Sequence, residues 1–394
     1  MKILVTGSNG FVGKNLVEKL KNRGYNQILE FTKENSIEEL ERYTRECNFV
    51  FHLAGVNRAM SESDFQDGNV ELTKKLVEFL EKNNNNSPIL FTSSVQSKLD
   101  NFYGKSKRQC EKIFLQHVSR TNAIVYIYRL TNVFGKWCKP NYNSVVATFC
   151  YNIANDLPIK VENKNRKLEL VYIDDVLEDF ISKLENNLVV GKTKKREIEL
   201  KSAHFFKIEK SYFITVKRLA DTICNFEEQR KKLVIPDLSE EFIKKLYSTY
   251  LSYVPVSKLK KKLKSNVDER GSFSEVLKSK EAGQISINIA KPNVVKGNHW
   301  HHTKMEKFLV VSGKGVVRLK NLNSNDLMEF FVNGDNFEVI DIPVGYVHNI
   351  ENLGDSDMIT LMWANEIFNP EKADTYGGVI SGKVKIDDNS RDET

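Results

Sequence analysis

The chain begins Met1-Lys-Ile-Leu-Val-Thr-Gly7-Ser-Asn9-Gly10-Phe11-Val12-Gly13, and the architecture of its first half can be worked out from these residues. The apolar run Lys2–Thr6 predicts a buried strand, and the residues after the last glycine have apolar side chains at helical spacing. Gly7 permits a tight turn, Gly10 allows the backbone to approach a pyrophosphate, and Gly13 lets helix and strand pack closely. The phosphates would rest on free N–H groups at the positive end of the helix. The stretch therefore predicts a dinucleotide-binding unit.

Further apolar runs follow, and they alternate with segments of helical periodicity. The predicted strands are Ile28–Phe31, Phe49–Leu53, Ile89–Thr92 and Val125–Tyr128. Leu72–Leu80, Gly104–His117, Asp174–Glu185 and Thr215–Lys231 are predicted helices. Strands that alternate with helices predict parallel βαβ units and a doubly wound α/β sheet.

The end of the second predicted strand bears on the choice between NAD and NADP. NAD enzymes carry an acid there, which binds the ribose 2′-hydroxyl. The residues after Phe31 are Thr32 and Lys33, and a cation at this place favours a 2′-phosphate, so we expect NADPH. Glu30 argues for NAD, but it falls earlier, within the predicted strand.

Tyr103-Gly-Lys-Ser-Lys107 places a tyrosine and a lysine on one face of a helix. The ammonium group would lower the pKa of the phenol, which could then exchange a proton with a carbonyl oxygen or an alcohol. Ser94, at the end of a predicted strand, would hydrogen-bond the same oxygen. We therefore expect Ser94, Tyr103 and Lys107 to be catalytic.

These residues resemble the extended short-chain dehydrogenase/reductase family, whose members modify nucleotide sugars. The resemblance covers residues 1–240 and adds the motifs His52-Leu53-Ala54-Gly55, Arg129-Leu-Thr-Asn132-Val-Phe-Gly135 and Tyr172-Ile-Asp174-Asp175-Val. One departure is the gap between Ser94 and Tyr103, which is shorter than in most of the family. The resemblance implies cofactor contacts from Gly7, Asn9, Gly10, Phe11, Val12, Gly13, Thr32, Lys33, Leu53, Ala54, Gly55, Tyr103 and Lys107. It implies substrate contacts from Arg58, Asn132, Trp137 and Asn141.

From Gly271 onward the sequence changes to short strands with glycine turns, which predicts an all-β barrel. This part contains Gly297-Asn-His299-Trp-His301-His302-Thr-Lys-Met-Glu306 and Pro343-Val-Gly345-Tyr-Val-His348. Three imidazoles and one carboxylate suit Zn²⁺ or another divalent transition metal. The expected ligands are His299, His301, Glu306 and His348. His302 would point to the opposite face of a regular strand and is the weakest candidate.

The spacing of these ligands resembles the two cupin motifs. A second resemblance competes, because Asp268–Glu275 and Lys296–His299 are similar to segments of dTDP-4-keto-6-deoxysugar epimerases, which are cupins that use no metal. It implies that Arg270 contacts nucleotide phosphate, Glu275 faces the substrate, and His299 is the catalytic base that removes a proton next to a ketone. His299 is therefore a ligand or a base, and the metal is catalytic or structural.

Longer strings, such as Trp137–Tyr151 and Gly297–Thr303, give the chain up to residue 376 a resemblance to bifunctional capsular polysaccharide enzymes. It implies a reductase domain (1–243), a zinc-binding cupin domain (244–376), a flexible tail (377–394) and a homodimer. The implied product pathway leads to UDP-N-acetyl-L-fucosamine. The cupin would epimerise C3 of a UDP-2-acetamido-2,6-dideoxy-4-keto-hexose, and the reductase would then reduce C4 with NADPH to UDP-N-acetyl-6-deoxy-L-talosamine.

The chemistry favours this order, since the 4-ketone makes the C3–H acidic and its reduction fixes the product. Three alternatives remain open. The protein could be a monofunctional reductase whose cupin serves structure, metal or sugar binding; it could be a scaffold; or it could be an NAD-dependent dehydratase or 4-epimerase that retains its cofactor.

Composition excludes several other classes. The 394 residues are 40% hydrophobic and 28% charged, as in globular proteins, and no apolar run reaches the ~20 residues that span a bilayer. The five cysteines form no CxxC pair, which suggests reduced thiols in the cytoplasm. The net charge of +7 includes lysine runs at Lys192–Arg196 and Lys258–Lys264 but no nucleic-acid motif. We expect neither nucleic acid nor membrane as partners.

Overall fold

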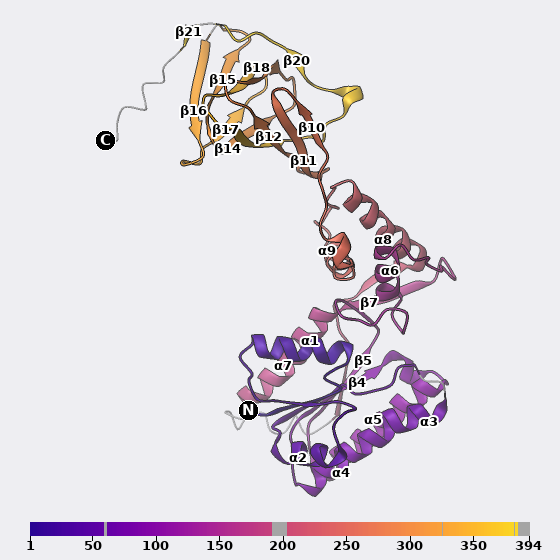
Figure 1. Ribbon diagram of the computed structural model, residues 1–394. Helices are drawn as coiled ribbons and strands as arrows, with labels where there is room; N and C mark the ends of the chain where they lie inside the picture. Colours follow the sequence, from indigo (N-terminus) through magenta and orange to yellow (C-terminus); the bar gives the residue numbers. More distant parts are fainter. Residues whose placement is uncertain (59–60, 191–202, 325, 382, 385–394) are drawn as a thin grey trace. The chain divides into compact units, whose positions relative to one another are not determined.

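The computed structural model describes residues 1–58, 61–190, 203–324, 326–381 and 383–384 (Figure 1). The chain divides into two compact units. Unit 1 consists of Met1–Asn225 and Glu241–Pro255, and unit 2 consists of Phe226–Glu240 and Val256–Thr394. The units thus exchange segments on either side of residue 243, and the predicted domain boundary there stays a prediction. Lys192–Arg196 and most of the predicted tail lie outside the described residues.

Unit 1 is built on a sheet of six parallel strands in the order β2-β1-β3-β4-β5-β8. The strands are β1 (Ile3–Thr6), β2 (Ile28–Phe31), β3 (Phe49–His52), β4 (Ile89–Ser94), β5 (Val125–Leu130) and β8 (Ala203–Phe206). A small second sheet contains β6 (Asn132–Phe134), β7 (Lys167–Tyr172) and β9 (Tyr212–Thr215). β2 pairs with one edge of β1, and β3 pairs with the opposite edge, so the strand order changes direction at β1. The carboxyl ends of β1 and β3 therefore flank the crevice where such sheets bind ligands.

Helices cover both faces of the large sheet. The described helices up to Leu251 are α1 (Phe11–Asn22), α2 (Ile37–Glu46), α3 (Glu62–Phe65), the π-helix η1 (Gln66–Glu71), α4 (Leu72–Lys82), the 3₁₀ helix η2 (Val95–Lys98), α5 (Phe102–Thr121), α6 (Val145–Ala154), α7 (Ile173–Val190), α8 (Val216–Lys231) and α9 (Glu241–Leu251). Alternate residues of each buried strand face opposite layers. Ile3 and Val5 pack with α1 and α7, whereas Leu4 packs with α2, α4 and α5. The predicted doubly wound α/β sheet is confirmed.

Unit 2 contains two six-stranded sheets packed face to face, with orders β10-β11-β12-β19-β14-β17 and β20-β13-β18-β15-β16-β21. The bounds are η4 (Val256–Lys258), β10 (Ser265–Asp268), β11 (Gly271–Ser279), β12 (Gly283–Ala290), β13 (Val295–Trp300), β14 (Glu306–Ser312), β15 (Lys314–Asn321), β16 (Asp326–Asn333), β17 (Val339–Ile342), β18 (Tyr346–Asn352), β19 (Met358–Ala364), η5 (Pro370–Lys372), β20 (Tyr376–Gly377) and β21 (Lys383–Val384). The pairing is antiparallel except for β16 with β21. The predicted C-terminal β-barrel is confirmed.

The core of unit 2 is apolar at one end only. Phe308, Val317, Leu319 and Ile350 are among the side chains buried between the sheets. On β12, however, the buried positions are Gln284, Ser286 and Asn288, while the isoleucines between them are half-buried on the outer face. Polar side chains that point inward require a polar interior, so this part of the barrel holds a site rather than a packed core.

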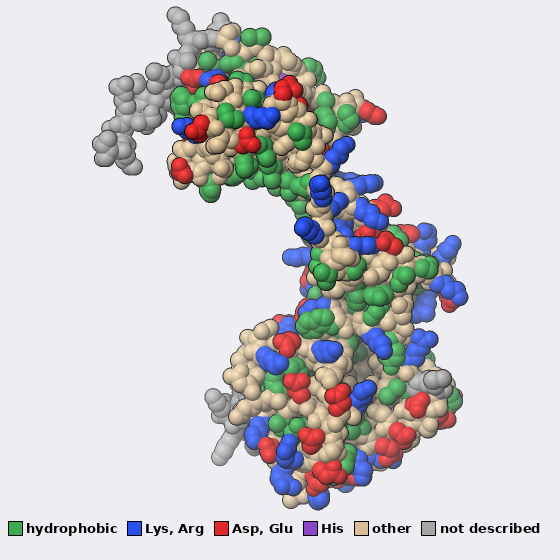
Figure 2. All heavy atoms as spheres, in the orientation of Figure 1, with side chains coloured by type: hydrophobic (Ala, Val, Ile, Leu, Met, Phe, Trp, Pro, Cys, Tyr) green, Lys and Arg blue, Asp and Glu red, His purple; other side chains and the backbone are tan. Residues whose placement is uncertain are grey.

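Several boundaries differ by a few residues from the sequence-based expectation, for example the ends of β4 and β5, which extend two residues beyond the predicted Thr92 and Tyr128. Helix α5 begins at Phe102, two residues before the predicted start, because Asn101 caps it by accepting a hydrogen bond from Gly104 N. Helix α7 extends from the predicted region to Val190. Within the described residues, no helix combines the length and the apolar character needed to cross a bilayer. On the face drawn in Figure 2, positive and negative side chains of unit 1 lie intermixed.

Candidate functional sites

The glycine-rich turn of unit 1 has the geometry of a phosphate cradle. Gly7 has a φ of +72°, and a Cβ there would lie 2.7 Å from the Cα of Ala54, so only glycine fits. Gly10 is the N-cap of α1 and no side chain caps the helix. Because the first N–H groups of α1 are not capped, they are available to an anion, and the helix dipole favours a negative charge there.

The ends of β1 and β3 are tied together beside this turn. Leu53 N donates to Thr6 O at 3.2 Å, and Ala54 N donates to Thr6 Oγ1 at 3.3 Å. These contacts place the Leu53-Ala54-Gly55 segment against Gly7. The predicted cofactor residues of the two segments therefore meet at the crevice between β1 and β3.

The residues that bear on the 2′-phosphate lie at the end of β2. Glu30 lies within β2, as expected, yet its side chain lines the hollow that Asn9 and Lys14 also line. Thr32 donates from N and Oγ1 to Asn35 Oδ1, at 2.8 and 3.1 Å, and the next residue, Lys33, is exposed. Lysines and the carboxylates of Glu18 and Glu30 thus share this region.

Ser94, Tyr103 and Lys107 come together where β4 ends and α5 begins. Sequence analysis predicted that Lys107 would lower the pKa of Tyr103. Instead, burial raises the pKa of Tyr103 to about 12, and a hydrogen bond with Ser94 opposes this shift only in part. Lys107 is buried, its Nζ donates to Thr92 O at 3.0 Å, and burial lowers its pKa. At neutral pH the Tyr103 phenol is therefore protonated and can act as an acid.

A buried ion pair seats α5 on the sheet. Arg129 of β5 donates to both carboxylate oxygens of Glu111 on α5, at 2.9 and 2.7 Å, and Ser93 Oγ donates to Glu111 Oε1 at 2.6 Å. Arg129 begins the family motif that also contains the predicted substrate residue Asn132, but its guanidinium group is bonded to Glu111 and lies 4.4 Å from the Phe205 ring centroid. Its role here is to fix the helix that carries Tyr103.

Asn69, which sequence reasoning missed, fixes the loop after β3. It lies in the π-helix η1, donates to Val56 O and Ser106 Oγ at 3.2 and 2.9 Å, and accepts from Val56 N at 2.7 Å. π-Helical turns inside helices are often found at functional sites. The sequence signal was weak, since the glycine beside Asn69 was the only hint of an irregular helix.

The four predicted substrate residues of unit 1 lie in different surroundings. Arg58 is exposed and donates to Tyr142 O at 2.8 Å, whereas Asn132 donates to Glu169 O at 3.1 Å. Asn141 N donates to Thr148 Oγ1 at 3.0 Å. Trp137 lines the hollow of Ser8 and Asn9 and is thus on the cofactor side of the turn. Their substrate role stays a prediction.

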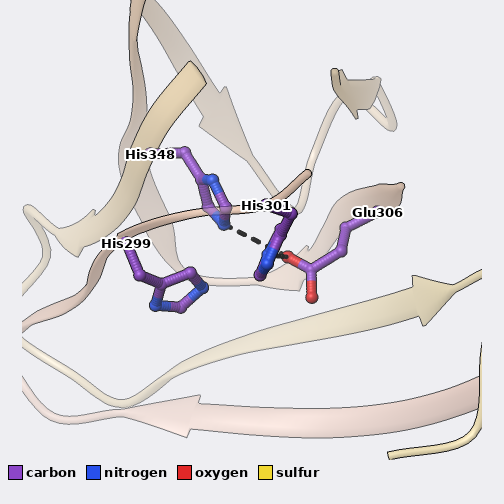
Figure 3. A group of neighbouring side chains, drawn as sticks. All are labelled: His299, His301, Glu306 and His348. Atoms are coloured by element: carbon purple, nitrogen blue, oxygen red, sulfur yellow. Dashed lines mark hydrogen bonds and ion pairs between the residues drawn. The ribbon is translucent and has the colours of Figure 1, made fainter. Parts of the chain in front are cut away.

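In unit 2, strands β13, β14 and β18 and the loop after β13 bring His299, Glu306, His348 and His301 together (Figure 3). β13 pairs with β18 so that His299 lies opposite His348. The strand register shifts between Gly297 and His299, which marks a β-bulge. β-Bulges beside functional sites often change the direction of a side chain, here that of His299. Gly297 has a φ of +110°, and a Cβ there would lie 2.8 Å from His348 O, so the bulge requires glycine. Glu306 is the first residue of β14.

The distances within this group fit one metal ion. All four ligand atoms lie within 4.8 Å of one another. Glu306 Oε2 lies 3.2 Å from His348 Nε2 and 3.5 Å from His301 Nε2. Ligands about 2.1 Å from a tetrahedral zinc ion are about 3.4 Å apart, which these separations match. His301 Nε2 is buried and has no hydrogen-bond partner among the described residues, as expected of an atom that serves a metal.

The charge state of the group also suits a cation. Although burial raises the pKa of Glu306, the contacts of its carboxylate with His301, His348 and Lys304 outweigh this effect and hold that pKa well below its usual range. Burial, together with the neighbouring His348, lowers the pKa of His299 to about 4. At neutral pH the carboxylate is ionised and His299 is neutral, and these are the forms that bind metals.

The group opens into a cavity of about 850 Å³ in unit 2. Arg270 and Glu275, the predicted substrate residues, line this cavity. Arg270 is paired with Asp268 at 2.6 Å, and Glu275 with Lys278 at 2.7 Å. His302 is not part of the group, because its ring packs against Trp300 and Tyr376.

Sequence reasoning missed several residues of this cavity. Lys304 Nζ lies 2.7 Å from Glu306 Oε1, and Lys296 Nζ donates to Asn288 Oδ1 at 3.0 Å. The inward-facing Gln284 and Ser286 complete the polar wall. The alternation of isoleucine with polar residues along β12 was the available signal, but it did not reveal which face is inside.

Taken together, the two units define a protein that joins a nucleotide-sugar type of dehydrogenase/reductase fold to a cupin barrel that carries a candidate metal site. Residues 3–193 match the NAD dependent epimerase/dehydratase family, and residues 266–376 match the polysaccharide biosynthesis C-terminal domain. The chain is 41% identical to the UDP-2-acetamido-2,6-beta-L-arabino-hexul-4-ose reductase of Pseudomonas aeruginosa, over 95% of this chain and 98% of that protein. The chain therefore belongs to the family of that reductase.

Solved structures agree with this assignment. The crystal structure of capsular polysaccharide assembling protein CapF from Staphylococcus aureus is 45% identical, with a TM-score of 0.86 over 96% of this chain and 100% of that chain. A crystal structure of CapF with the inhibitor 3-isopropenyl-tropolone is 42% identical, with a TM-score of 0.82 over 96% of this chain and 99% of that chain. The resemblance to the capsular polysaccharide protein CapF is confirmed.

Proposed function

We propose that the protein is a bifunctional nucleotide-sugar enzyme of UDP-N-acetyl-L-fucosamine biosynthesis. The cupin unit epimerises C3 of a UDP-2-acetamido-2,6-dideoxy-4-keto-hexose. The other unit reduces the C4 ketone with NADPH and gives UDP-N-acetyl-6-deoxy-L-talosamine. The observation that carries this proposal is that both sites are built in one chain, which is 41% identical along 95% of its length to a reductase of a UDP-linked 4-keto sugar.

In the reductase unit, bound NADPH supplies a hydride to C4. The residues of this chain handle the proton. Tyr103, protonated because burial raises its pKa to about 12, donates its O–H proton to the new alkoxide. Ser94 orients the same oxygen, and Lys107 braces the end of β4 through its bond to Thr92 O. Solvent then returns a proton to Tyr103, so that one NADPH and one proton are consumed for each ketone.

In the cupin unit, His299, His301, Glu306 and His348 would hold Zn²⁺, and a bound zinc ion would act as a Lewis acid on a carbonyl oxygen. Removal of the C3 proton and its return to the opposite face require a base and an acid within the cavity. Two readings of His299 stay open, as a ligand or as the base. Arg270 and Glu275 both line the cavity; the guanidinium group of Arg270 would bind a diphosphate, and Glu275 would face the sugar.

The metal has indirect support from a relative. A tropolone carries a carbonyl and a hydroxyl oxygen on neighbouring carbons, an arrangement that chelates divalent metals, and CapF was solved with such an inhibitor. The four-ligand group of this chain is a suitable place for a metal that such a compound would bind. A zinc ion that only stabilises the barrel is the alternative.

The remaining assignments are cofactor choice, location and assembly. Lys33 after β2, with Lys14 and Lys21 on α1, favours NADPH over NADH despite Glu30. The buried thiols of Cys47, Cys110, Cys138 and Cys150 suit the reducing cytoplasm. The half-buried isoleucines on the outer face of β12 supply an apolar surface for a homodimer.

The experiment that tests this function measures the zinc-to-protein ratio alongside NADPH oxidation on a UDP-4-keto-6-deoxy amino sugar. We expect one zinc per chain and one NADPH oxidised per sugar. A reaction that proceeds without net NADPH consumption would identify a dehydratase or 4-epimerase that retains its cofactor. Stoichiometric oxidation without zinc would leave a monofunctional reductase.

A further inference from the structure

The segment Pro370–Gly377 forms one wall of the candidate metal site. After η5, residues Ala373, Asp374 and Thr375 line the same cavity as His299 and His348. β20 then pairs with β13, so that Gly377 lies opposite His299. A segment at the C-terminal end of the barrel thus contacts both the strand that carries one candidate ligand and the loop that follows it.

The Asp374 carboxylate binds the turn between His301 and Glu306. Its Oδ1 accepts from His302 N at 2.9 Å, and its Oδ2 accepts from Thr303 N at 2.7 Å and from Lys304 N at 2.9 Å. Thr303 Oγ1 donates to the same Oδ2 at 2.9 Å. Hydrogen bonds to an ionised acceptor are about twice as strong as neutral ones. Since this turn joins two candidate ligands, the carboxylate sets how far apart they lie.

The backbone carbonyl of Asp374 contacts the His301 ring. His301 Nδ1 lies within hydrogen-bond distance of Asp374 O. A carbonyl oxygen can only accept, so the ring carries its proton on Nδ1 and presents the lone pair of Nε2 to the group of ligands. Contacts of this kind fix the tautomer and the orientation of metal-binding histidines. One residue therefore controls both the turn and the ring.

We propose that Asp374 is a positioning residue for the four-ligand group. Its carboxylate holds the 302–304 turn, and its backbone carbonyl fixes the tautomer of His301, so that Asp374 maintains the geometry of the four ligands. The inference rests on the metal site of the proposed function. It adds that the segment Pro370–Gly377 is part of that site, although Asp374 is 70 to 72 residues from the residues of the turn in sequence.

The test measures the dissociation constant for Zn²⁺ in the full-length chain, by competition with a chromogenic chelator. Asp374→Ala should raise this constant by about 10- to 100-fold, the usual effect of losing a partner of a ligand. Asp374→Asn keeps one acceptor oxygen and should cause a smaller rise. Glu371→Ala is the matched control, because Glu371 is an exposed acid of the same segment and does not line the cavity, and it should leave the constant unchanged.

Near-UV circular dichroism shows whether each variant keeps the native packing of its aromatic side chains. If Asp374→Ala does not keep it, Asp374→Asn decides the question. Unchanged zinc affinity in a folded Asp374 variant would overturn the inference and leave the metal site intact. A wild-type chain that binds no zinc would instead overturn the metal site of the proposed function.

Discussion

At the scale of single residues, the proposed reduction depends on Tyr103. Replacement of Tyr103 by Phe removes the proton donor and should lower the rate of NADPH oxidation by about 10²- to 10⁴-fold. Epimerisation should persist, because it uses residues of the other unit. Because burial raises the pKa of Tyr103 to about 12, the wild-type rate should not fall through loss of this proton below about pH 10. Equal loss of both activities in the variant would contradict this assignment.

His52 gives a pH-dependent prediction for unit 1. Its ring lies between Thr6 Oγ1 and Thr73 Oγ1, at 2.8 and 3.0 Å, and burial lowers its pKa to about 3. The unfolded chain binds a proton at about pH 6.5, whereas the folded chain does not until about pH 3, so stability falls as the pH drops through this window. Between pH 6.5 and 5 the loss should be about 2 kcal/mol.

Urea unfolding at a series of pH values measures this loss. His52→Gln, which cannot take up the proton, should have a flatter pH dependence over the same window. A variant with the wild-type slope would show that another group causes the loss.

At the scale of secondary-structure elements, α5 and β4 must stay in register for Ser94 to meet Tyr103. Glu111 on α5 supplies this register, because it accepts a hydrogen bond from Ser93 on β4 and pairs with Arg129 on β5. The side-chain exposures of the ion pair are 5% for Glu111 and 30% for Arg129. Glu111→Ala leaves the guanidinium group without its partner and should cost about 3 kcal/mol, the lower end of the range for a broken buried pair. It should also lower kcat for reduction, because α5 carries Tyr103 and Lys107.

The matched control is Glu78→Ala on α4, whose partner Lys75 lies 3.4 Å away and is half exposed. Exposed pairs of this kind contribute little, so its unfolding free energy and kcat should not change measurably. Equal stability of the Glu111 and Glu78 variants would contradict the role given to the buried pair.

Local patterns predicted the elements well, because the residues that form them are neighbours in sequence. The turn around Gly7 and the His299–Glu306 ligand spacing are examples. Glu111, Asn69 and Asp374 could not be found in this way, since their partners come from other strands and helices. The pKa of Tyr103 was also predicted wrongly, because a helical spacing reveals a neighbouring lysine but not how deeply the phenol is buried.

At the scale of the whole molecule, the proposed function requires that two separate sites act on one substrate in a fixed order. The 4-ketone is needed for epimerisation and is destroyed by reduction. The two activities should therefore be separable by substitution in either unit, and the cupin activity should need no NADPH. Because each unit contains its own complete set of candidate residues, this independence follows from the structure of each unit taken by itself.

The most direct test is the incorporation of deuterium at C3 of a UDP-2-acetamido-2,6-dideoxy-4-keto-hexose, incubated with the full-length chain in D₂O without NADPH and followed by NMR. The account predicts deuterium at C3, which His348→Ala should abolish while NADPH-dependent reduction of a ready-made epimer continues. No deuterium at C3, in a preparation that oxidises NADPH with the same sugar, would contradict the account and leave a reductase whose cupin has another purpose.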